Sequence, residues 1–187
     1  MGKDKKSKSF ELALSGISCA IAVAVLPLGI MTGVGSLTAA GYLIAVLALM
    51  LPLSRQFYWG AFLAYVATCI LTIVLGAVVQ FWNLVPFIMF FGLHPIANML
   101  QLKFKINKWL AFAIKALWFD ATLIAGYYLV FGGLLGGNLL PAEVYEIINK
   151  YIFLLIFTVG TAMFFVYDYL IFKLQIMVNG IVYKIKK

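Results

Sequence analysis

The positively charged residues of this chain gather in a few short groups, and long apolar stretches lie between these groups. All but two of the 14 lysines and arginines belong to them. The groups are Lys3, Lys5, Lys6 and Lys8; Arg55; Lys103, Lys105 and Lys108; and Lys173, Lys184, Lys186 and Lys187. Positive charge beside membrane-spanning helices stays on the cytoplasmic side. The alternation therefore predicts that the chain crosses a membrane, and it also predicts the orientation.

The composition agrees with a membrane protein. The chain is 65% hydrophobic and 11% charged, whereas soluble domains carry about 25% charged residues. The net charge of +8 could indicate nucleic acid binding, but the lysines are divided among the ends of apolar stretches. We therefore expect membrane lipids as partners and no nucleic acid.

Six stretches are apolar and approach the roughly 20 residues that a membrane-spanning helix needs. They comprise residues 11–31, 37–53, 58–80, 84–102, 109–131 and 151–172. We expect an all-α bundle of six transmembrane helices in one membrane domain, residues 11–172. Basic cytoplasmic tails, residues 1–10 and 173–187, are expected on either side of this domain.

The segments between these stretches differ in charge. We expect a break at Gly33 and Gly35, a tight turn over residues 81–83, and the longest connector over residues 141–150. The first two carry no charge, and the third carries two glutamates and one lysine. These three segments are predicted to lie outside, so that both termini are cytoplasmic.

Four ionisable residues fall inside the predicted spans: His94, Lys115, Asp120 and Asp168. Such residues in a membrane are expensive to bury without a partner. Lys115 and Asp168 lie at similar depths from the inner basic edges, about 10 and 7 Å at 1.5 Å per residue. This similarity predicts a structural ion pair, and the alternative is that Lys115 extends to the inner interface.

His94 and Asp120 lie deeper, about 13 and 18 Å from the inner edge. Both are candidates for contact with a small polar ligand, although a hydrogen bond between packed helices is the alternative. One helical face would carry the set Phe87, Phe91, His94, Asn98 and Gln101. Pro95 lacks an N–H donor and is expected to leave the carbonyl of Phe91 without its usual partner.

The first span contains small residues at every fourth position, Gly16, Ala20 and Ala24. Such rows let helix backbones approach closely, either inside one protein or against a partner. The chain shows no serine-hydrolase elbow, zinc-protease motif, phosphate loop or paired-cysteine motif. We therefore expect no enzyme, no cofactor and no metal site.

The basic N-terminal tail, the six predicted helices and Ala20-xxx-Ala24 together resemble the substrate-binding subunit, or S-component, of energy-coupling factor (ECF) vitamin transporters. The resemblance implies a bacterial plasma-membrane protein that docks on a transmembrane coupling protein linked to two cytoplasmic ATPases. It implies that Gly16, Ala20 and Ala24 form the docking face. It also implies an outward-facing substrate site with the candidate residues His94, Asp120, Trp82, Asn83, Tyr127 and Asn138.

Two other functions fit the same residues. A non-catalytic subunit that scaffolds a larger membrane assembly would use the polar residues as helix contacts. A small enzyme acting on lipid-linked substrates would use His94 and Asp120 as an acid–base pair. The direction in which His94 and Asp120 point would distinguish these three functions.

Overall fold

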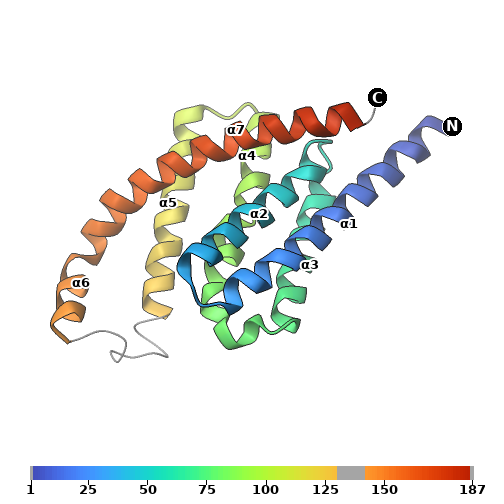
Figure 1. Cartoon of the computed structure of the whole chain (residues 1–187). Helices are drawn as coiled ribbons and strands as arrows, with labels where there is room; N and C mark the ends of the chain where they lie inside the picture. Colours follow the sequence, from blue (N-terminus) through green and yellow to red (C-terminus); the bar gives the residue numbers. More distant parts are fainter. Residues whose placement is uncertain (1, 130–141, 186–187) are drawn as a thin grey trace. The chain divides into compact units, whose positions relative to one another are not determined.

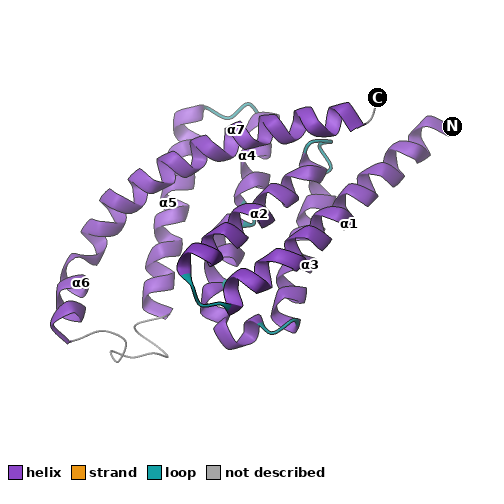
Figure 2. Cartoon of the chain, in the orientation of Figure 1, coloured by secondary structure: helices purple, strands orange, loops and turns teal. Residues whose placement is uncertain are grey.

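The computed structural model describes residues 2–129 and 142–185, and those residues are helical with short turns and no strand (Figures 1 and 2). Four helical segments are long and apolar enough to cross a membrane: Lys8–Met31, Gly35–Leu53, Lys108–Tyr127 and Asn149–Lys184. The apolar helix Tyr58–Val74 is shorter. The chain therefore has the character of an α-helical membrane protein.

The chain divides into two compact units. The first comprises residues 1–105 and 171–187, and the second comprises residues 106–170. Helix α7 (Thr161–Ile185) contributes to both. Each unit is described by itself below.

The first unit is built on α1 (Gly2–Met31), α2 (Gly35–Leu53) and α3 (Tyr58–Val74), which pack together (Figure 1). The turn between α1 and α2 uses Gly33, whose φ of 65° suits glycine. Thr38 Oγ1 donates to the carbonyl of Gly29 at 3.0 Å. Because Gly29 has no side chain, the two helices can approach closely at this point.

Three of the predicted helix limits agree with the structure. The predicted ends at residues 31 and 53 coincide with Met31 and Leu53, and α3 starts at Tyr58 as predicted. The third predicted span, residues 58–80, is too long. Gly76 has a φ of 107°, which separates α3 from the 3₁₀-helix η1 (Ala77–Asn83). The predicted tight turn at 81–83 lies inside η1 and is therefore also wrong.

The fourth predicted span, residues 84–102, is not one regular helix. It contains the π-helix η2 (Phe87–Phe91), a turn at Gly92 and Leu93, and α4 (His94–Lys103). Pro95 occupies the first turn of α4, where a missing N–H donor is tolerated. The helix therefore restarts near Pro95.

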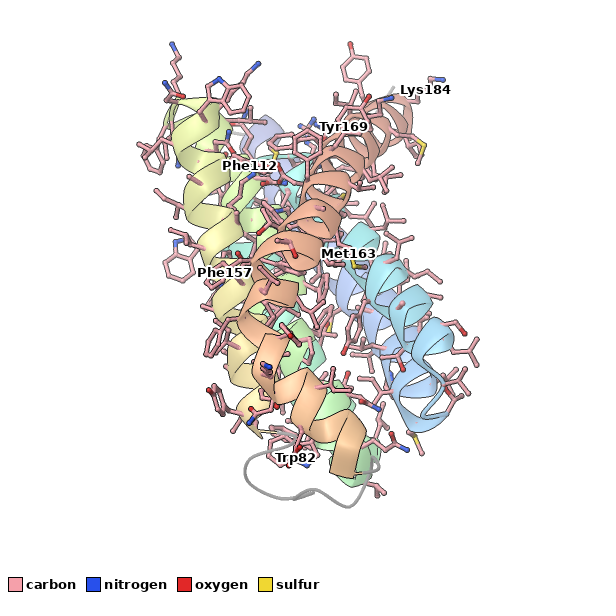
Figure 3. All side chains as sticks on the ribbon, turned by 90° about the vertical axis from the view of Figure 1, so that its left-hand side faces the viewer. Trp82, Phe112, Phe157, Met163, Tyr169 and Lys184 are labelled. Carbon is pink, nitrogen blue, oxygen red and sulfur yellow. The ribbon has the colours of Figure 1, made fainter. Side chains whose placement is uncertain are left out.

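In the second unit, α5 (Lys108–Tyr127) lies beside a continuous helical run (Figure 3). The run consists of α6 (Ala142–Leu155), the π-helix η4 (Ile156–Gly160) and α7. The predicted connector over residues 141–150 is wrong for residues 142–150, since α6 begins at Ala142. Pro141 lies outside the described residues.

Both predicted tails are helical where they are described. Helix α1 begins at Gly2, and α7 continues to Ile185. The predicted C-terminal boundary at residue 172 relied on Lys173, but buried residues continue with Gln175, Val178 and Val182. One lysine on an exposed face does not end a helix.

Candidate functional site

Among the described residues of the second unit, several polar contacts join α5 to the run of α6, η4 and α7. They include Lys115–Asp168, Asp120–Thr161 and Tyr127–Asn149. As the residue number rises along α5, the number of its partner falls. This register is that of two antiparallel helices, so the contacts form a line along one interface.

Lys115 and Asp168 form a buried ion pair. Lys115 Nζ lies 2.6 Å from Asp168 Oδ1, and both residues are less than a tenth exposed. The sequence predicts this pairing from similar depth, and the structure brings the two residues together. A paired charge is retained in an apolar interior far more readily than an unpaired one, so the lysine is held inside the unit.

Asp120 lies at the next contact along the interface. It is 3% exposed, and its Oδ2 accepts a hydrogen bond from Thr161 Oγ1 at 3.1 Å. Its Oδ1 has no hydrogen-bond partner among the described residues. The sequence identifies Asp120 but not Thr161, because an uncharged threonine in an apolar stretch has little effect on hydropathy.

The contact between Asp120 and Thr161 adjoins η4, which ends at Gly160. A methyl group placed on Gly160 would lie 3.0 Å from Leu123 Cδ1 and 3.5 Å from Asp120 Oδ1. Gly160 therefore allows α5 to approach η4 at this point. In η4 the N–H of Thr161 donates to the carbonyl of Ile156, five residues earlier. Such π-helical turns frequently occur at functional sites.

Tyr127 is the third candidate on α5. Its hydroxyl lies 3.2 Å from Asn149 Oδ1, and the contact is exposed. Asn149 lies in the predicted connector, so the apolar pattern of the sequence gives no reason to name it as a partner of Tyr127. The candidate Asn138 lies outside the described residues.

His94 belongs to the first unit and Asp120 to the second. His94 is fully buried at the start of α4, and its ring centroid lies 5.0 Å from that of Phe90. Asn98 and Gln101 are also buried on the same helix. Three hydrogen-bonding side chains therefore face the interior of the first unit from α4.

Trp82 and Asn83 are half-buried in η1. The side-chain amide of Asn83 donates to Gln80 Oε1 at 2.7 Å, and the Asn83 carbonyl accepts from the hydroxyl of Tyr42. These bonds connect η1 to itself and to α2. The two candidates thus contribute to the local structure of the first unit.

The small-residue row lies on the outer face of α1. Gly16, Ala20 and Ala24 are all exposed, and nothing lies within 4 Å of a methyl group placed on Gly16. Ser18, Ala22 and Leu26 are fully buried instead. Within the described residues, α1 packs against its neighbours through a different face.

The described part of the chain contains no cluster of three or more His, Cys, Asp or Glu side chains that could hold a metal ion. No protein-family model, curated protein or solved structure matches the chain.

Proposed function

We propose that this chain is the substrate-binding membrane subunit of an ECF-type uptake transporter for a vitamin or a similar small molecule. In this proposal the chain spans a bacterial plasma membrane six times with both termini in the cytoplasm. Cytoplasmic ATPases of the partner module energise uptake, and the chain itself is not an enzyme.

The observation that carries the proposal is the exposure of Gly16, Ala20 and Ala24. A row of small residues that its own protein does not use for packing is available for close approach by another helix. The coupling protein of an ECF module is the partner that the resemblance implies. The large hydrophobic side chains Ile17 and Ile21 are exposed beside this row and would add contact area.

The buried polar residues support a substrate site. His94, Asn98 and Gln101 supply hydrogen-bonding groups to the interior of the first unit, and Asp120 supplies a carboxylate to the second. Substrate sites are mostly apolar with a few placed polar groups. Trp82 and Asn83 in the first unit, Tyr127 in the second, and Asn138, which lies outside the described residues, remain further candidates that the resemblance implies.

A membrane scaffold is the second candidate function. The ion pair between Lys115 and Asp168 and the hydrogen bond from Thr161 to Asp120 favour it. Both are contacts between packed helices, as a structural subunit would have.

Native mass spectrometry of the gently purified protein in lipid nanodiscs distinguishes these two functions. The transporter proposal predicts a small molecule retained in stoichiometric amounts by the wild type and lost in His94→Ala. A scaffold would retain lipids alone, and the same lipids would remain bound to the variant.

A further inference from the structure

The buried charges of the second unit do not balance. Among its described residues, the buried ionisable side chains are Lys115, Asp120 and Asp168. Lys115 and Asp168 neutralise one another in their ion pair. Among the described residues of this unit, no cation pairs with the carboxyl group of Asp120, and a buried carboxylate without a partner is costly in an apolar interior.

The geometry at Asp120 leaves one oxygen atom available. Thr161 Oγ1 donates to Oδ2, whereas Oδ1 is buried and has no hydrogen-bond partner among the described residues. Oδ1 faces Gly160, since a methyl group on that residue would lie 3.5 Å from it. The available oxygen is therefore directed at the main chain where η4 ends.

The donor atoms around this position are oxygens. Asp120 offers a carboxylate, and the hydroxyl oxygen of Thr161 keeps lone pairs while it donates its proton. The π-helix also alters the main chain, because the N–H of Thr161 donates to Ile156 rather than to the carbonyl of Phe157 four residues earlier. Such an irregular helical turn often occurs at functional sites.

We propose that Asp120 and Thr161, beside the main chain at Gly160, bind a monovalent inorganic cation, with Na⁺ as the best match. A single positive charge neutralises Asp120, whereas a divalent ion would leave a net charge buried. Oxygen donors suit hard cations. Leu123 Cδ1 would lie 3.0 Å from a methyl group on Gly160, so the adjoining space favours a bare ion over an organic amine. This site does not depend on the proposed uptake function.

Thermal unfolding of the full-length protein in nanodiscs tests the site. Choline chloride is replaced stepwise by sodium chloride at a constant ionic strength of about 0.15 M. A ligand that binds the folded state raises the melting temperature in a saturable way. We expect this rise for the wild type. We expect no rise in a parallel titration in which choline chloride is replaced by methylammonium chloride.

Three variants of the site residues and one control variant test whether the sodium-dependent rise in melting temperature arises at this site. Asp120→Asn should remove the sodium-dependent rise, and Thr161→Ala should raise the sodium concentration at half-effect about tenfold. Thr161→Ser keeps the hydroxyl and should behave as the wild type. Thr158→Ala is the matched control, because the Thr158 hydroxyl donates to the carbonyl of Leu154.

Equilibrium binding of radioactive sodium to the wild type measures the number of sodium sites directly. This number does not depend on how the variants fold. The proposal predicts one saturable site for each chain. It is overturned if the wild type binds no sodium, or if Asp120→Asn binds it as well as the wild type does. A melting temperature that is independent of sodium, which a protonated Asp120 would produce, also overturns it.

Discussion

Lys115 Nζ and Asp168 Oδ1 lie 2.6 Å apart, and their residues are separated by 53 positions in the chain. The contact fixes the register between α5 and α7, since both partners are buried. Along the same interface of α5, the described residues also include the contacts Asp120–Thr161 and Tyr127–Asn149.

Replacing either partner of this pair should destabilise the protein. Lys115→Met or Asp168→Asn alone should lower the free energy of unfolding by about 3 kcal/mol, because the remaining charge stays buried. The double variant Lys115→Met/Asp168→Leu should recover much of that loss. Reversible unfolding in mixed micelles measures all three, and single variants as stable as the wild type would contradict a structural role.

Gly29 and Gly16 provide a matched pair of substitutions in α1. A methyl group at Gly29 would lie 2.7 Å from the carbonyl oxygen of Leu37, whereas nothing lies within 4 Å of one at Gly16. Gly29→Ala should therefore destabilise the first unit by about 1–3 kcal/mol. Gly16→Ala should be neutral, or stabilising by about 0.5 kcal/mol. Equal melting temperatures for the two variants would contradict the close contact between α1 and α2.

The orientation in the membrane can be measured with single cysteines. Cysteine is introduced at Ser7, Glu143 or Lys186 in a background without Cys19 and Cys69. An impermeant thiol reagent applied to intact cells should label the Glu143 position alone, because the basic ends are predicted to be cytoplasmic. Labelling at Ser7 or Lys186 would show the opposite orientation for that terminus.

The proposed substrate site makes a separate prediction for His94. His94→Ala should weaken substrate affinity at least tenfold while the melting temperature changes little. Asp120→Asn should also weaken substrate affinity at least tenfold with little change in melting temperature. Affinity and melting temperature are measured in choline chloride, so that sodium has no effect on them. The ligand is the molecule identified by native mass spectrometry. If these residues are structural instead, the unpaired groups should lower stability by about 1–3 kcal/mol and leave affinity unchanged.

Hydropathy predicted the helices that end at clear breaks. The limits at Met31, Leu53 and Tyr58 agree because glycines or Arg55 interrupt the apolar sequence there. Hydropathy could not find the end of α3 at Val74, since Ala77 and the following residues are also apolar. The break depends on the φ of Gly76, which a count of apolar residues does not contain.

The polar contacts also include one that the sequence predicts and one that it does not. Lys115 and Asp168 were predictable as a pair because both are charged and lie at similar depth. Thr161 could not be recognised as the partner of Asp120, because the pairing depends on the register between α5 and η4. The π-helices η2 and η4 were not predictable either, because their five-residue hydrogen bonds leave no mark on the hydropathy of the sequence.

The composition of the complex purified from native membranes tests the central claim most directly. The affinity-tagged chain should be isolated with a transmembrane coupling protein and two ATPases in fixed stoichiometry, identified by mass spectrometry. Ala20→Leu should fold but lose these partners, because a larger side chain prevents close helix approach. Ala40→Leu, at an exposed position of α2, should retain them. A wild-type chain that purifies without any ATPase, or an Ala20→Leu variant that keeps the full complex, would contradict the account.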